Sequence, residues 1–66
     1  MSSVTGPDLR RERRAAEVSV VAVAALMRLS RQAIHNLENA AEPDPDRVRQ
    51  YLEAVKTARA DKAIAS

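Results

Sequence analysis

The sequence predicts an all-α domain of four helices, with a fifth helix as an alternative at the C-terminal end. Three observations support this class. Apolar residues recur at helical spacing in several short segments, and residues typical of helix starts precede these segments. A proline-containing loop separates the last long helical segment from the ones before it. The chain has 66 residues, which is the length of one small domain.

The N-terminal segment is expected to form an arm followed by a helix. Residues 1–6 are small, polar and unpatterned, so we expect a flexible arm. Thr5, Pro7 and Asp8 are helix-start signals: a cap, a proline suited to the first turn and an acid that complements the helix dipole. They predict a helix over about residues 8–17. Its inward side chains are expected to be Leu9, Ala16 and the stem of Arg13.

Two helical periods with a break between them occupy residues 18–39. The first period has one apolar face at positions i, i+3, i+4 and i+7, made by Val20, Val23, Ala24 and Met27. The pattern stops at Leu29-Ser30, where Ser30 can cap a second helix. We predict helices over about residues 20–27, capped by Ser19, and over about residues 31–39.

The second of these helices has two chemically different faces. Its inward positions are Ala33, Ile34 and Leu37, and its outward positions are Gln32, His35, Asn36 and Asn39. An outward row of amides and an imidazole, almost without carboxylate, is costly to desolvate and useless for a core. It is well suited to hydrogen-bonding the edges of bases. We therefore interpret the pair as a helix-turn-helix, with residues 31–39 entering a DNA groove.

The C-terminal part is predicted to be one long helix. Asp44 and Pro45 are a cap and a first-turn proline, and the buried stripe is expected to be Val48, Tyr51, Leu52, Val55 and Ala58. Beyond Ala58 the pattern weakens but helix formers continue. The expected organisation is an arm (1–6), a DNA-binding domain (7–58) and a helical tail (59–66).

The helix over residues 20–27 is apolar nearly all round, because Val21, Ala22, Ala25 and Leu26 lie off its core face. Such a helix must be covered on more than one side. We expect the first and fourth helices of the same chain to cover it. The alternative is a subunit contact, and thus a homodimer, through this helix or the helical tail.

These residues resemble the helix-turn-helix of the lambda-repressor-like family, which includes phage repressors and Cro proteins. The matching register is Val18-Ser19, Val23-Ala24, Met27, Leu29-Ser30-Arg31, Ile34 and Leu37-Glu38, and the resemblance covers roughly Leu9 to Val55. Three positions depart from it. Val20 replaces a glutamine that holds a phosphate. Arg28 replaces the turn glycine, which requires a non-glycine residue to accept a near-left-handed conformation. Ala40 replaces a glycine that ends the recognition helix.

Composition narrows the function classes. The chain has no cysteine and one histidine, so neither a disulfide framework nor a metal site is expected, and no cofactor or small-molecule ligand is indicated. Catalysis is not expected either, because no acid pair or nucleophile converges. Arg10–Arg14 followed by an apolar run resembles a signal peptide, but the run is far shorter than the roughly 20 residues of a membrane span. The expected location is a bacterial cytoplasm or nucleoid.

Charge is unevenly distributed along the chain. Up to Asn39 there are six arginines and four acids, whereas five basic residues balance five acids from Ala40 onward. A positive N-terminal part is typical of DNA-binding proteins. The arginines of the first helix have an alternative interpretation, a solvated face that keeps an alanine-rich helix soluble.

The sequence predicts which side chains meet DNA. The expected base-reading residues are Arg31, Gln32, His35 and Asn36. For His35 three alternatives stay open: a contact with a base, a contact with a phosphate, or exposure to solvent alone. The resemblance also implies base reading for Arg31, Gln32 and Asn36. The expected phosphate contacts are Arg28, Ser30, Asn39, Arg47 and Arg49. Glu38 is expected to be structural.

The function these features indicate is a sequence-specific regulator of transcription that binds double-stranded DNA. It would be most similar to a small phage Cro or repressor that binds an operator, usually as a symmetric dimer. The alternative is a protein-interaction module, such as an antitoxin or adaptor, built on the same motif.

Overall fold

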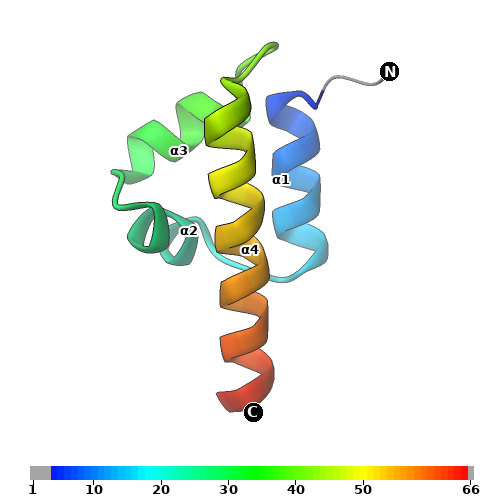
Figure 1. Ribbon diagram of the computed structural model, residues 1–66, viewed down its shortest axis with the longest axis vertical. Helices are drawn as coiled ribbons and strands as arrows, with labels where there is room; N and C mark the ends of the chain where they lie inside the picture. The colour runs from blue at the N-terminus through cyan, green and yellow to red at the C-terminus, as the bar shows by residue number, and fades with distance from the viewer. Residues whose placement is uncertain (1–3, 66) are drawn as a thin grey trace.

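The computed structural model describes residues 4–65, with side chains described as far as Asp61. The described residues form four helices: α1 (Gly6–Ala15), α2 (Val20–Met27), α3 (Arg31–Glu38) and α4 (Pro45–Ala65). Figure 1 shows that α1 and α4 run in the same direction, that α2 and α3 lie to one side of α4, and that the end of α4 projects beyond the other helices. The all-α prediction is confirmed, and within 4–65 no fifth helix separates from α4.

Each helix contributes one fully buried side chain to the core. Leu9, Val23, Ile34 and Tyr51 all have 0% exposure, and Val18, Ala24, Ala54 and Val55 are buried around them. Burying a side chain of this size contributes roughly 1.5–3 kcal/mol relative to exposing it. A domain this small has few such groups, so the helix arrangement depends on all four.

The start of α1 lies earlier than the sequence predicts. Thr5 caps the helix, as expected from the sequence, and Asp8 completes a reciprocal capping box with it, but the helix begins at Gly6. The Gly6 N–H donates to the carbonyl of Ala40 at 2.8 Å, which ties α1 to the end of α3. The expected arm is therefore wrong for Thr5 and Gly6, because this hydrogen bond and the cap order them. Residues 1–3 of the expected arm lie outside the described residues.

The end of α1 is also earlier than predicted. Glu17 adopts a left-handed conformation with φ 58°, so the helix ends at Ala15. The Val18 N–H then donates to the Arg13 carbonyl at 3.1 Å, and the Glu17 N–H donates to the Arg14 carbonyl at 3.0 Å. These two bonds satisfy carbonyls that the helix end would otherwise leave unpaired.

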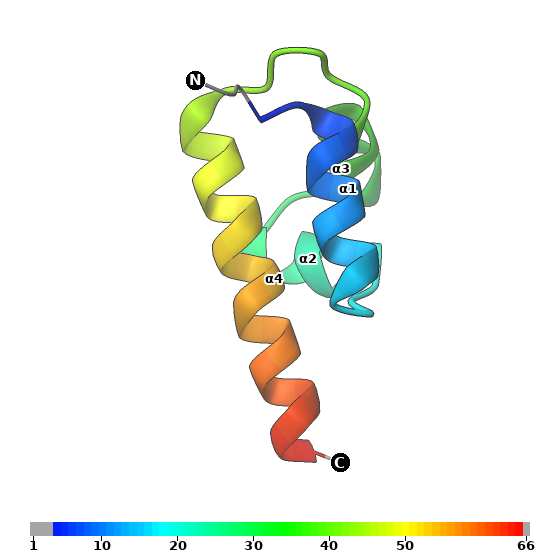
Figure 2. The same cartoon turned by 90° about the vertical axis from the view of Figure 1, so that its right-hand side faces the viewer.

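Helix α4 has a different buried stripe from the predicted one. Leu52 is 37% exposed, so its placement in the stripe is wrong, whereas Ala54 is 5% exposed and belongs to the core. The reason is that α2 packs against α4 on the side of Ala54, where a small side chain permits close approach. Figure 2 shows α4 continuing without a break past this contact, so the expected tail is the end of α4 itself.

Helix α2 is covered on one side only. Val21 is 58% exposed and Leu26 is 45% exposed, although Ala22 packs against the core. The expectation that α1 and α4 cover this helix is therefore wrong for Val21 and Leu26, because α4 covers neither side chain and Leu26 lines an open groove between α2 and α4. No described helix is both long and apolar enough to cross a bilayer.

Gly6→Ala is expected to destabilise the fold by roughly 1–3 kcal/mol, as overpacking does. A Cβ at this position would lie 2.5 Å from the Leu37 carbonyl oxygen and 2.6 Å from the Glu38 carbonyl carbon. Helix propensity alone predicts the opposite sign, because alanine is the better helix former. Urea denaturation distinguishes the two, with Pro7→Ala at the exposed neighbouring position as the control. A Gly6→Ala variant as stable as the native chain would contradict the packing argument.

Candidate nucleic-acid interface

The connection between α2 and α3 is short, and hydrogen bonds close the helix ends on both sides of it. Arg28 ends α2 in the left-handed conformation, at φ 57° and ψ 42°. The Leu29 N–H donates to the Ala24 carbonyl at 2.9 Å, the same closing bond that ends α1. Ser30 then caps α3, because its Oγ accepts from the Ala33 N–H at 3.1 Å. The predicted strain at Arg28 and the predicted cap at Ser30 are both present, so the direction of α3 relative to α2 is fixed locally.

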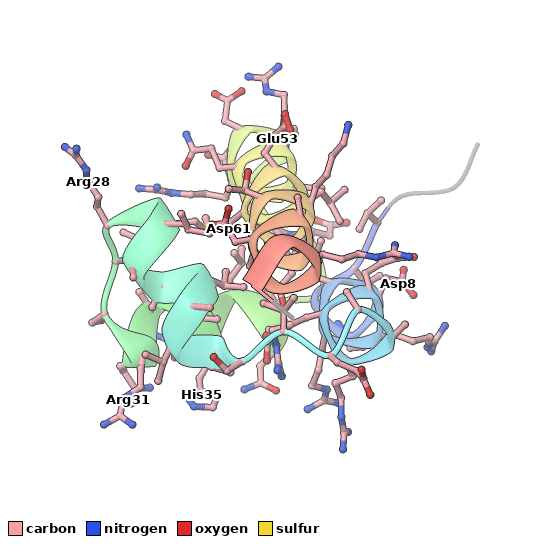
Figure 3. The ribbon with its side chains drawn as sticks, turned by 90° about the horizontal axis from the view of Figure 1, so that it is seen from below. Asp8, Arg28, Arg31, His35, Glu53 and Asp61 are labelled. Carbon is pink, nitrogen blue, oxygen red and sulfur yellow. The ribbon has the colours of Figure 1, made fainter. Side chains whose placement is uncertain are left out.

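Helix α3 divides into a buried back and an exposed front. Ile34 is fully buried and Glu38 is 2% exposed, while Leu37 is partly buried against the core. The front carries the four predicted base readers, all of them exposed: Arg31, Gln32, His35 and Asn36. Figure 3 shows Arg31 and His35 projecting from the same side of the molecule, away from α4. The structure therefore brings these four side chains together on one solvent-facing ridge.

Two of the predicted base-reading side chains are oriented by each other. The Gln32 Nε2 donates to Asn36 Oδ1 at 3.1 Å across one turn of α3. This bond leaves the Gln32 carbonyl oxygen as an acceptor and the Asn36 amide nitrogen as a donor. An acceptor next to a donor complements the donor and acceptor that adenine presents in the major groove.

The five predicted phosphate-binding residues do not form one group. Ser30 and Asn39 stand at the two ends of α3, as its caps. Arg47 lines a shallow hollow of about 360 Å³ together with Asn36, so the start of α4 reaches the ridge. Arg28 and Arg49 line a groove of about 590 Å³ between α2 and α4, on the side of Glu53, and Arg47 lines this groove as well as the hollow. In Figure 3 Glu53 points away from Arg31 and His35.

The start of α4 is ordered by its own ion pair and hydrogen bond. Arg49 pairs with Asp46 at 2.9 Å, and Arg47 donates to the side-chain oxygen of Gln50 at 3.0 Å. These side chains are held along α4 by bonds that a phosphate oxygen can replace. Exposed bonds of this kind contribute little stability, so exchanging them costs little.

A buried carboxylate holds the back of α3. Glu38 Oε2 accepts from Arg13 Nε of α1 at 2.8 Å and from the Tyr51 hydroxyl of α4 at 2.5 Å. Arg13 also donates to the Val18 carbonyl at 3.0 Å, so the chain after α1 joins the same network. The structural role predicted for Glu38 is confirmed. No described buried side-chain nitrogen or oxygen lacks a hydrogen-bond partner.

This network raises the pKa values of Tyr51 and Arg13. Burial, and then the hydrogen bond to the Glu38 carboxylate, raise the pKa of Tyr51 far above its usual range. Burial alone would lower the pKa of Arg13, but the hydrogen bond and charge of Glu38 outweigh it and the net shift is upward. Arg13 is thus held as the cation and Tyr51 as the neutral donor, which is the combination that a buried carboxylate requires.

Sequence reasoning missed the partners in this network and the packing role of Gly6. The signal for the network was a carboxylate at the edge of the buried face of α3 and an arginine stem on the buried face of α1. The signal for Gly6 was that it is the only glycine in the chain. Neither signal names the contacting residue, because the contact joins different helices.

Comparison with known proteins gives one family match. A family model described as a helix-turn-helix domain matches residues 6–63, which is most of the chain. No curated protein matches the chain, and no solved structure matches it.

The Tyr51–Glu38 bond is expected to make stability fall at high pH. Because the pKa of Tyr51 is raised in the folded state, its contribution is fully present below the unfolded tyrosine pKa of about 10 and is lost as pH rises above it. The free energy of unfolding should fall by up to about 1.4 kcal/mol per pH unit there. Denaturant titrations between about pH 8 and 11 measure this slope, and Tyr51→Phe should remove it. Equal slopes in the two proteins would show that Tyr51 does not titrate in this way.

Proposed function

We propose that this chain, which belongs to the helix-turn-helix domain family, is a sequence-specific regulator that binds double-stranded DNA. The observation that carries this proposal is the ridge of α3, where Arg31, Gln32, His35 and Asn36 are exposed while Ile34 and Glu38 anchor the same helix from behind. Four hydrogen-bonding side chains on a rigid convex helix match the depth and chemistry of a major groove.

Helix α3 reads bases through its front face. Arg31 donates two hydrogen bonds to guanine, and the Gln32–Asn36 pair presents an acceptor and a donor to adenine. His35 shares the face and donates to a base edge or to a phosphate. Each well-placed pair contributes roughly 1–3 kcal/mol of discrimination between bases.

Phosphate contacts surround this ridge. Ser30, Asn39 and Arg47 lie at the ends of α3 or beside it, and they position the helix without reading sequence. Arg28 and Arg49 belong to the same proposal, but they line only the groove between α2 and α4, which Arg47 shares, so they contact DNA where the backbone passes that side.

The protein acts in the manner of a small phage Cro or repressor, occupying an operator and blocking transcription in a bacterial host. Two copies bind symmetric half-sites about 34–36 Å apart. The exposed apolar residues Val21 and Leu26 of α2, or the projecting end of α4, supply the contact between the two copies.

A second function is favoured by the same exposed residues. Val21 and Leu26, at 58% and 45% exposure, are large aliphatic side chains on a helix adjoining the reading motif. A partner protein could cover them in place of a second copy, as in an antitoxin or adaptor. Tight binding to a co-encoded protein without a footprint on any duplex would favour this function.

Selection of bound sites from random duplexes tests the leading proposal. We expect an enriched motif, a footprint of defined length and a strong dependence on salt. Symmetry and spacing in the motif would report the number of subunits. Recovery of no enriched sequence, with binding that is equally weak for all duplexes, would overturn sequence-specific regulation.

Gln32→Ala is expected to weaken binding to the selected site by roughly 1–3 kcal/mol and to relax preference at particular base pairs. Arg31→Ala should do the same at a guanine. Lys56→Ala, at an exposed position of α4 outside the ridge and both hollows, serves as the control. Competition binding against single-base variants of the site measures the preference. An unchanged preference in Gln32→Ala would show that the reading face is assigned wrongly.

Arg47→Ala is expected to weaken all duplexes alike, because a phosphate contact carries no sequence information. The slope of log K against log salt should become shallower by about 0.9. Fluorescence anisotropy at several salt concentrations measures it. The matched control is Lys56→Ala, which removes one positive charge from an exposed position farther along α4. A slope that changes equally in both variants would reflect net charge rather than a contact.

A further inference from the structure

Helix α1 carries two exposed arginines whose side chains take no part in the core. Arg10 and Arg14 are exposed, and neither forms an ion pair or hydrogen bond with any described residue. The other two arginines of α1 are engaged: Arg11 pairs with Asp8 at 3.6 Å, and Arg13 holds the buried Glu38. Like charges four residues apart repel each other, so this pair slightly destabilises α1.

The core sets where these two arginines point. In Figure 3 Asp8 projects away from the side on which Arg31 and His35 lie. Successive residues of an α-helix are about 100° apart, so Arg10 lies about 200° round from Asp8, on the opposite side of α1. Arg14 follows Arg10 one turn later on nearly the same side. Both arginines therefore face the way that the reading ridge of α3 faces.

Helix α1 is fastened beside α3 in this orientation. Its first residue, Gly6, bonds to the Ala40 carbonyl just after α3, and Arg13 bonds to Glu38 at the last turn of α3, both at 2.8 Å. The arginines thus project next to the C-terminal end of the ridge, from a helix that cannot rotate without breaking these bonds.

The surface between the arginines is shaped for an anion. Pro7, Arg10, Arg11 and Arg14 line a shallow hollow of about 230 Å³. The carboxylates within α1, Asp8 and Glu12, lie about 120–160° round the helix from Arg10 and Arg14. One helical turn, about 5.4 Å, is of the same order as the spacing of phosphates along a DNA strand, about 3.4 Å of axis per charge.

We propose that Arg10 and Arg14 form a second phosphate-binding site, which grips the DNA backbone flanking the groove that α3 reads. This inference rests on the proposed function. It makes α1 an element that contacts DNA directly as well as supporting the motif, and it gives a use to two exposed positive charges one turn apart.

The test compares Arg10→Ala, Arg14→Ala and the double variant with Lys56→Ala, using the selected duplex and anisotropy at several salt concentrations. Each single variant should make the salt slope shallower by about 0.9, and the double variant by about 1.8, with base preference unchanged. Lys56→Ala should leave the slope as it is. A double Arg→Lys variant should restore it, because lysine also binds phosphate as a point charge.

Neutral methylphosphonate linkages in the duplex locate the contact. A linkage that weakens binding of the native protein should have no further effect on the double alanine variant if these side chains meet that phosphate. Circular dichroism confirms that each variant is folded. The inference is overturned if the double variant keeps the native slope. If the native protein binds no duplex with preference, the proposed function itself is overturned. That result differs from a native salt slope in the double variant, which overturns only the phosphate site of Arg10 and Arg14.

Discussion

The hydrogen bonds of the buried Glu38 carboxylate connect three of the four helices. It accepts from Arg13 of α1 and Tyr51 of α4, and it sits in the last turn of α3. Removing one partner of a buried pair costs about 3–5 kcal/mol, because an uncompensated charge is left behind. This cost makes the network a constraint on geometry. Helix α3 can occupy only the position in which both donors reach its carboxylate, so its front face has one orientation.

A second constraint acts at the turns, where non-glycine residues take the left-handed conformation. Glu17 and Arg28 have φ 58° and 57° and close α1 and α2 with the same pair of hydrogen bonds. A left-handed non-glycine residue costs roughly 1–2 kcal/mol. The domain tolerates this cost twice because Val18 and Leu29, the residues that follow, must enter the core directly. Local strain is thus offset by burial.

The sequence predicts the structural features that depend only on residues close to each other along the chain. The caps Thr5, Ser19 and Ser30, the bounds of α2 and the strain at Arg28 all follow from residue types within a few positions. What the sequence missed depends on the approach of another helix: Ala54 replaces Leu52 in the core because α2 packs there. For the site, periodicity predicted correctly which side chains of α3 are exposed, but their contacts with DNA remain predictions.

Helix α1, like α3, has a buried face that packs in the fold and an exposed face that is proposed to bind DNA. Its inner positions, Gly6, Leu9 and Arg13, contact the end of α3 or the core, and this fixes the rotation of the helix about its axis. Because the inner face is fixed, the direction of Arg10 and Arg14 is fixed as well. The proposed DNA surface therefore consists of helix positions held by a packed core rather than of mobile loops. Such a surface loses little backbone conformational entropy on binding, so the cost of ordering falls mainly on the side chains.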